Sequence, residues 1–429
     1  MLRFVFLEHS MKDKTNKKDQ SKIYLMVFLF VFAISNIGLT QPFNFSQTGN
    51  QKRIEIPFTY HQNFILIEVK MFALLPMKFI FDTGAEHTIL FKRQYADIMG
   101  VEYERRIPIV GADLSLELFA LVARQVTLQV NGMPIMDKDI LVLERDLFKL
   151  DEITGSQIDG IIGGEFFKNV IFHINYRKQK ITLLPKSEFP KPGKGYKTIP
   201  INLKSNKPYT IAEVSLEDGR SMDLELLVDT GAGIPLLLHN NSNQNLGLPS
   251  NYITGKLGVG LGGMIKGYIG RVRSVKIGDI QFDQVITNFQ DLPESVILDE
   301  SKFRNGILGN QILSRFDIWF DYISEKMYLK PGRQLKKKFN MDRSGMIVFA
   351  TGQNLNVYVV QDVIEGSPAD KAGILVGDVI KTIQGLPAKV FSLNGIIRKL
   401  QKKQGKKIRL QLLRNNKTIR KTFKLRDLV

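Results

Sequence analysis

Cysteine is absent from the 429 residues of this chain. Its absence excludes disulfide bonds, thiolate nucleophiles, thiolate-ligated zinc and lipid attachment through a cysteine. The five histidines form no H-E-x-x-H motif and no pair spaced by four residues, which removes the usual helical metal site. The G-x-S-x-G and P-loop patterns are missing as well. We therefore expect no metal and no cofactor.

Acidic residues are scarce at one end of the chain. The formal net charge is +18, and residues 333–429 carry 21 Lys and Arg against six Asp and Glu. Hydrophobic residues make up 44% and charged residues 24%, which is ordinary for globular proteins and excludes wholesale disorder. Any affinity for anions is therefore expected in the C-terminal part. No nucleic-acid motif accompanies the basic residues there, and we expect no nucleic-acid partner.

Long hydrophobic runs are also lacking, apart from one short stretch near the N-terminus. Residues 23–34 are 12 uninterrupted apolar residues, and a lysine-rich segment precedes them. The run is shorter than the roughly 18–20 residues of a spanning helix, and this arrangement is typical of a secretion signal. We expect residues 1–40 to be a signal peptide, or an N-terminal membrane anchor if residues 37–39 extend the run. The protein is then periplasmic or extracellular.

The middle of the chain contains an internal repeat. Residues 81–85, Phe-Asp-Thr-Gly-Ala, recur as Val-Asp-Thr-Gly-Ala at 228–232, an offset of 147. Residues 159–163, Asp-Gly-Ile-Ile-Gly, recur as Asn-Gly-Ile-Leu-Gly at 305–309, an offset of 146. Two motifs that return at almost the same spacing indicate duplicated halves. Short runs rich in Val, Ile, Phe and Leu between turn dipeptides predict that both halves are β structure.

Each half carries one aspartate where a strand breaks into a loop. We place the halves at residues 55–188 and 197–332, and in each a buried-strand pattern ends at a carboxylate, Asp82 or Asp229. Symmetric packing of the halves would bring the two carboxylates together. Two carboxylates about 3 Å apart cannot both ionise near neutral pH, so the pair would share one proton. One could then act as general base on a water while the other acts as general acid.

The residues after the aspartates suit a supporting role. Thr83 and Thr230 supply hydroxyl groups that can brace the pair. Gly84 and Gly231 allow backbone N–H groups to approach the carboxylates and fix their orientation.

With these motifs, the two halves resemble the retropepsin-like and pepsin-like aspartic peptidases. In that group each lobe has an Asp-Thr-Gly followed by a hydrophobic-hydrophobic-Gly motif, which residues 161–163 and 307–309 match. The resemblance implies a bilobed all-β fold and an aspartic endopeptidase that acts on polypeptide substrates, with Asp82 and Asp229 as catalytic residues. Alanine after both Asp-Thr-Gly copies looks retropepsin-like, whereas a single chain with two lobes is similar to pepsin.

Aspartic peptidases close their cleft with a glycine-containing hairpin, the flap. Gly260, Gly262 and Gly263 are candidates for this hairpin in the second half. The first half offers only Gly111 in a comparable place, so the assignment of the flap to one lobe stays open.

The composition changes near residue 343. Three short motifs follow in order, which are Gly-Ser-Pro-Ala at 366–369, Ala-Gly-Ile at 372–374 and Gly-Asp-Val-Ile at 377–380. Ser367 is placed to cap a short helix that has Pro368 in its first turn. The order of these motifs resembles a bacterial PDZ domain, a small α+β unit that we place at residues 343–429.

The PDZ resemblance implies a peptide-binding role. PDZ domains add an extended peptide as a strand and hold its C-terminal carboxylate with backbone N–H groups. The loop with Gly345, Met346 and Ile347 would hold that carboxylate here. Peptide or protein C-termini are then the expected partners of this domain.

Two functions of different classes follow. The first is an exported aspartic endopeptidase whose PDZ domain recruits or positions substrates. The second is a catalytically inactive scaffold whose PDZ domain binds peptides. Both Asp-Thr-Gly copies are intact, which favours the enzyme. A third arrangement, in which the PDZ domain holds the flap or the chain's own tail so that activity depends on a ligand, also stays open.

Overall fold

The structure is a computed structural model that describes residues 53–110, 117–131, 133–146, 149–260, 263–292 and 303–429. The chain divides into two units, Met1–Thr40 and Gln41–Val429. The expected signal or anchor segment over residues 1–40 lies outside the described residues. Within the described ranges, the helices are all too short or too polar to cross a membrane.

Strands dominate the first half of the repeat. Its elements are β1 (Ile54–His61), β2 (Phe64–Met71), β3 (Leu75–Phe81), β4 (Ile89–Leu90), α2 (Arg93–Ile98), β5 (Tyr103–Val110), β6 (Glu117–Val130), β7 (Met133–Leu143), α3 (Leu150–Thr154), β8 (Gly160–Ile162), η2 (Gly164–Phe166), β9 (Ile171–Asn175), β10 (Lys180–Leu184) and η3 (Lys186–Glu188).

The second half is built in the same way. Its elements are β11 (Lys197–Pro200), β12 (Asn202–Lys204), β13 (Lys207–Ser215), β14 (Ser221–Asp229), β15 (Leu236–His239), η4 (Asn240–Ser242), β16 (Tyr252–Gly260), β17 (Gly263–Ile277), β18 (Ile280–Gln290), β19 (Gly306–Gly309), α5 (Asn310–Leu313), β20 (Phe316–Asp321) and β21 (Lys326–Pro331).

One strand order occurs in both halves. It is β2-β3-β8-β4-β7-β6-β5 in the first and β13-β14-β19-β15-β18-β17-β16 in the second. In each, the short strand with the hydrophobic-Gly motif lies between a parallel and an antiparallel neighbour. The parallel neighbour, β3 or β14, is the strand that leads into an aspartate. The expectation of a mainly β fold with two related lobes is confirmed.

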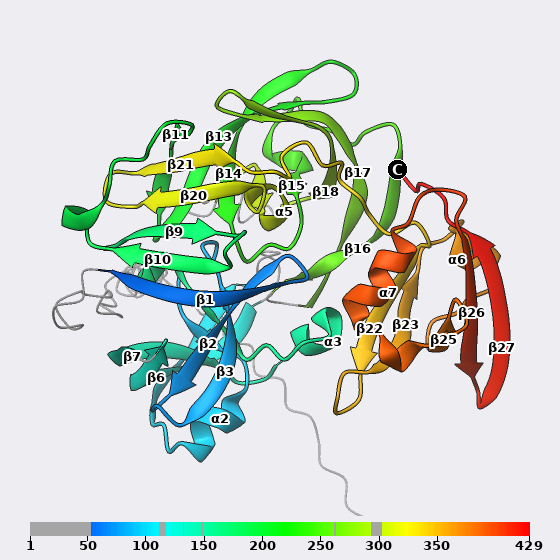
Figure 1. Ribbon diagram of the computed structural model, residues 1–429, viewed down its shortest axis with the longest axis horizontal. Helices are drawn as coiled ribbons and strands as arrows, with labels where there is room; N and C mark the ends of the chain where they lie inside the picture. The colour runs from blue at the N-terminus through cyan, green and yellow to red at the C-terminus, as the bar shows by residue number, and fades with distance from the viewer. Residues whose placement is uncertain (1–52, 111–116, 132, 147–148, 261–262, 293–302) are drawn as a thin grey trace, which may run out of the picture. The chain divides into compact units, whose positions relative to one another are not determined.

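The two halves share a sheet. Strands β9 and β20 pair antiparallel and lie side by side in Figure 1, so β11, β20 and β21 join the strands of the first half in one 13-stranded sheet of the described residues. The other described strands of the second half form an eight-stranded sheet. Phe172 and Phe320 stack across this junction with ring centroids 4.8 Å apart. Both belong to a hydrophobic core that contains residues of the two halves. Burial of this common apolar surface holds the halves together.

Side chains of β14 alternate between two faces. Leu226 and Val228 belong to the common core, whereas Leu227 belongs to a separate small cluster. The other fully buried members of that cluster are Tyr209, Leu237 and Ile307. Because side chains two positions apart share a face of a strand, Asp229 lies on the face of Leu227, opposite the core.

The C-terminal part forms its own sheet and core. Its elements are β22 (Met346–Thr351), β23 (Val357–Val363), α6 (Pro368–Lys371), β24 (Val379–Ile383), β25 (Leu386–Pro387), η5 (Ala388–Val390), α7 (Leu393–Leu400), β26 (Lys407–Arg414) and β27 (Lys417–Lys424). The strand order is β22-β23-β24-β26-β27, with β25 beside β24, so β22 is an edge strand. The expected cap is confirmed, because the Ser367 hydroxyl accepts a hydrogen bond from the Asp370 N–H at 3.3 Å.

Candidate active site

Both aspartates stand at the end of a buried strand. Asp82 follows β3, and its N–H donates to the carbonyl of Ile162 at 3.0 Å. Asp229 is the last residue of β14 and lies beside Gly309 of β19. The short strand β8 or β19 therefore anchors the backbone at each aspartate. This contact limits how far the carboxylates can move.

Backbone N–H groups orient the carboxylates. The N–H groups of Gly84 and Ala85 donate to Oδ1 of Asp82 at 2.7 and 3.1 Å. The N–H of Gly231 donates to Oδ1 of Asp229 at 2.7 Å. Each loop therefore folds back on its own aspartate and leaves the other carboxylate oxygen for a partner.

The two threonines cross between the halves. The Thr83 hydroxyl donates to the carbonyl of Val228 at 2.7 Å, and the Thr230 hydroxyl donates to the carbonyl of Phe81 at 2.7 Å. Each hydroxyl also accepts the N–H of the opposite threonine at 3.0 Å. Both threonines are fully buried. These four hydrogen bonds form a closed, symmetric lock that brings the two loops together.

The carboxyl groups of Asp82 and Asp229 are hydrogen-bonded neighbours, and their environments differ. Burial raises the pKa of Asp82 well above its usual range, and the negative charge of Asp229 raises it further. Burial also raises the pKa of Asp229, but the hydrogen bond from Asp82, the Gly231 N–H and the positive charge of Arg304 lower it. A positive charge near one carboxyl group only favours the ionised form of that group, Asp229, over that of its partner.

Arg304 gives the second half a charge that the first half lacks. It is 5% exposed and comes just before β19, two residues ahead of Gly306. At the repeat offset of 146, the first half has Ile158 at this position. The guanidinium lies beside the hydroxyl of Tyr209 and near Asp229. A buried cation on one side only makes the electrostatics of the pair asymmetric.

Both halves present a hairpin where a flap was expected. In the second half β16 and β17 pair along their length, with Gly260 opposite Gly263 at the tip. Gly262 lies outside the described residues. In the first half β5 and β6 form the equivalent hairpin, with Val110 opposite Glu117. The sequence suggested a hairpin clearly only in the second half, because the first is poor in glycine, and Gly111 also lies outside the described residues.

In the C-terminal part, the predicted carboxylate-binding loop is internally hydrogen-bonded. The N–H of Gly345 donates to Oδ1 of Asp342 at 2.7 Å, and the N–H of Met346 donates to the Ser344 hydroxyl at 3.1 Å. Met346 begins the ladder between β22 and β23, opposite Val363, and Ile347 lies opposite Asp362. A role for this loop in holding a carboxylate stays a prediction.

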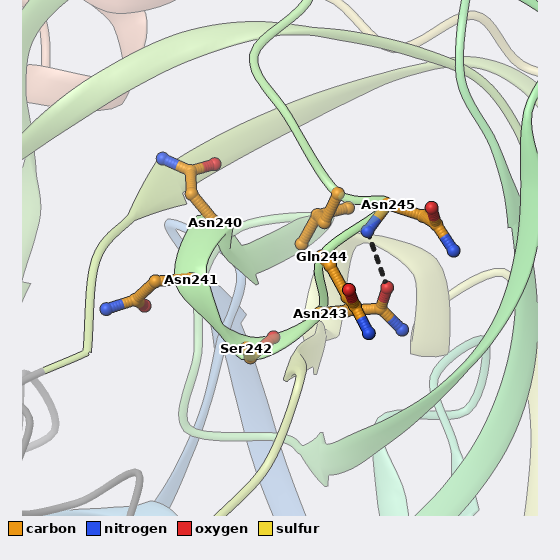
Figure 2. A pocket seen from close by; sticks show the side chains of 7 residues that line it. Asn240, Asn241, Ser242, Asn243, Gln244 and Asn245 are labelled. Carbon is orange, nitrogen blue, oxygen red and sulfur yellow. Dashed lines mark hydrogen bonds between the residues drawn. The ribbon is translucent and has the colours of Figure 1, made fainter.

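One surface hollow of about 630 Å³ lies along residues 240–246. Figure 2 shows its lining of asparagine, glutamine and serine side chains, with the N–H of Asn245 bonded to the side chain of Asn243 at 2.9 Å. No lining residue is ionisable, so the hollow has no group for acid–base chemistry. Among the described residues, no cluster of His, Asp and Glu is arranged to hold a metal ion.

Three residues of these sites were missed at the sequence level. Arg304 could have been found by comparing the halves, because a charged residue replaces Ile158 directly before the repeated motif at residues 305–309. Asp342 gave no such signal, since only the folded loop brings its carboxylate to the N–H groups that follow. Tyr209, which lies beside Arg304, is an ordinary strand residue in sequence.

Comparison with known families agrees with this arrangement. Residues 212–312 match the aspartyl protease family, and this segment includes Asp229, β19 and the second hairpin. Residues 337–425 match the PDZ domain family, and this segment includes the whole C-terminal sheet.

Proposed function

On the premise that the chain carries an aspartyl protease domain and a PDZ domain, we propose that it is an aspartic endopeptidase with Asp82 and Asp229 as its catalytic pair. The observation that carries the proposal is the crossed lock of Thr83 and Thr230, which brings together two aspartates 147 residues apart. Packing two halves together does not require two carboxyl groups at their junction, and removing carboxyl groups from water is costly. The pair therefore supports a catalytic role.

The proposed reaction is direct attack by water on a peptide bond. Ionised Asp229 takes a proton from a bound water, and the oxygen of this water adds to the carbonyl carbon. At the same time protonated Asp82 gives its proton to the carbonyl oxygen. The C–N bond then breaks as Asp229 returns a proton to the leaving nitrogen, and Asp82 recovers its own as the carboxyl product forms. The asymmetry around Arg304 supports this division of roles.

A cleavage experiment tests the proposal. A mixed peptide library is incubated with the purified chain across pH, beside Asp82→Asn and Asp229→Asn. We expect a bell-shaped pH profile that both substitutions abolish, because the pair needs one proton and one negative charge. Asp223→Asn is a matched control, since this exposed residue lies on the same strand as Asp229. No cleavage at any pH would instead favour an inactive scaffold.

The PDZ domain is proposed to recruit or position polypeptide substrates. Strand addition at the edge strand β22 would hold a substrate by its backbone. We expect a peptide that binds the PDZ domain to raise KM for long polypeptides and to leave short peptides unaffected. An equal effect on both substrates would point to the ligand-dependent arrangement, in which the PDZ domain controls the site itself.

Export is proposed from the N-terminal sequence. A basic segment before the apolar run over residues 23–34 supports a signal peptide or an anchor. Cell fractionation with N-terminal sequencing tests it. A shortened chain in the periplasm or medium would indicate cleavage, and an intact chain in the membrane fraction would indicate anchoring. An intact chain in the cytosol would contradict export.

A further inference from the structure

The loop before β22 already contains a carboxylate. Oδ1 of Asp342 accepts the N–H of Ser344 at 2.8 Å, the Ser344 hydroxyl at 2.7 Å and the N–H of Gly345 at 2.7 Å. The Ser344 hydroxyl in turn accepts the N–H of Met346 at 3.1 Å. Three consecutive backbone donors are thus engaged, two of them by the Asp342 carboxylate.

The loop is held in this conformation from its other side. The carbonyl of Ser344 accepts the N–H of Ala369, and the carbonyl of Gly345 accepts the N–H of Ile364, at 2.9 and 2.8 Å. Gly345 has a φ of +81°, and a Cβ there would lie 2.2 Å from Cβ of Ser367. Close packing and a left-handed backbone therefore keep the three N–H groups directed at their internal acceptors.

The cation next to Asp342 in the sequence is paired elsewhere. The Arg343 guanidinium pairs with Asp427 and donates to the carbonyl of Gln401 at 2.9 Å, at the end of α7. It is therefore not arranged to receive a second carboxylate. A ligand carboxylate would have to compete with Asp342 for the N–H of Gly345 and with the Ser344 hydroxyl for the N–H of Met346. Two carboxylates so close together also repel one another.

We propose that this PDZ domain selects an internal, extended segment of a polypeptide rather than a free C-terminus, because Asp342 fills the loop that would hold a terminal carboxylate. The inference rests on the proposed role of the domain in recruiting substrates. An internal segment needs only the backbone ladder along β22 and contacts of its side chains. Such selectivity suits an endopeptidase, whose cleavage sites lie within a chain.

The side chain of Asp342 also responds to pH. Burial raises the pKa of Asp342 to about 6, while the bonds from Ser344 and Gly345 oppose the rise. The carboxylate is therefore charged at neutral pH and retains its preference for N–H donors there. The binding experiment below is accordingly run at pH 7.5.

Two peptide libraries with the same random ten-residue sequences test the proposal, one ending in a free carboxylate and the other in a carboxamide. Both are captured on the full chain carrying Asp82→Asn, so that bound peptides are not cleaved. We expect the two libraries to bind equally. Adding Asp342→Ala should free the donors and favour the free carboxylate about tenfold, since the freed N–H groups can then bind a charged ligand group.

Two further variants separate the causes. Asp342→Asn keeps an acceptor oxygen and removes the charge, so its preference should be intermediate. Asp370→Asn is the matched control, because the side chain of exposed Asp370 accepts the N–H of Gly366 at 2.9 Å, outside the loop. It should bind both libraries equally, and retained binding of the carboxamide library shows that each variant is folded.

The possible results are distinct. A tenfold preference for the free carboxylate before any change at Asp342 would overturn the inference and leave peptide recruitment intact. Equal binding by Asp342→Ala would also overturn it, because the donors would then not be limiting. Binding of neither library by the chain with intact Asp342 would contradict the proposed recruiting role itself, whatever the protease activity measured separately.

Discussion

Gly84 of the first half lies against the side chain of Asp229 in the second. A Cβ built on Gly84 would be 2.3 Å from Cγ of Asp229, and a Cβ on Gly231 would be 2.2 Å from Cγ of Asp82. The aspartate of each lobe therefore lies against a glycine of the other lobe. The two carboxyl groups can approach one another only because neither glycine carries a side chain.

The first prediction concerns these glycines. Gly84→Ala or Gly231→Ala should lower kcat/KM by about 100-fold or more, since the methyl group must displace the facing carboxylate and small misplacements of reacting groups are costly. Steady-state cleavage of a library-derived peptide checks this. Gly193→Ala is the control, because a Cβ there meets no atom within 4 Å. Near-normal activity of both active-site variants would contradict the contact.

A second prediction concerns the threonine lock. Thr83→Ala removes a donor to Val228 and an acceptor for the N–H of Thr230, both fully buried. We expect the free energy of unfolding to fall by about 2–4 kcal/mol, as each buried group left unsatisfied costs about 1–3 kcal/mol. Urea unfolding measures the change. Thr83→Ser keeps the hydroxyl, so its free energy of unfolding should fall by less than about 1.5 kcal/mol. A fall as large as that of Thr83→Ala would show that the methyl group contributes more than the hydroxyl.

The third prediction concerns pH and Arg304. The guanidinium lowers the pKa of Asp229, so its removal in Arg304→Met should raise that pKa. A base is active only when ionised, so the acidic limb of the kcat/KM profile should move to higher pH. Arg304→Lys keeps a positive charge and should therefore shift this limb less than Arg304→Met. The other ionisable groups around the pair, Tyr209 and Tyr322, have raised pKa values and stay neutral over this range.

The control for Arg304 is a second cation beside Tyr209. Nζ of Lys204 lies 5.0 Å from the centre of the Tyr209 ring, but it is paired with Glu225 at 2.6 Å. Lys204→Met should therefore leave the acidic limb in place. A shift of equal size in both variants would mean that general surface charge sets the profile.

A fourth prediction concerns a partly buried ion pair of the first half. Nζ of Lys92 lies 2.8 Å from Asp159, which is fully buried, and 2.9 Å from Asp151. Asp159→Asn should destabilise the protein by about 1–3 kcal/mol, because Lys92 keeps its charge and loses one partner. The double variant with Lys92→Met should recover part of that loss in urea unfolding. No recovery would show that the cost comes from other bonds of Asp159.

Much of the architecture was readable from local patterns. The strands predicted to lead into Asp82 and Asp229 are β3 and β14. Alternating and continuous apolar runs indicate which residues are buried. These strands can therefore be predicted from residues that are close together in the sequence. The repeat offset supplied the long-range information, because equivalent residues of duplicated halves occupy equivalent places.

The sequence by itself determined the two aspartates, their threonines and glycines, and the two kinds of domain, since these residues recur in recognisable order. Only the tertiary structure decided which groups surround them. Arg304 and Asp229 are 75 positions apart, and a long side chain finds its partner only when the strands are packed. Asp342 binds the following N–H groups only because Gly345 turns left-handed against Ser367. Side-chain direction, unlike strand periodicity, depends on contacts that form last.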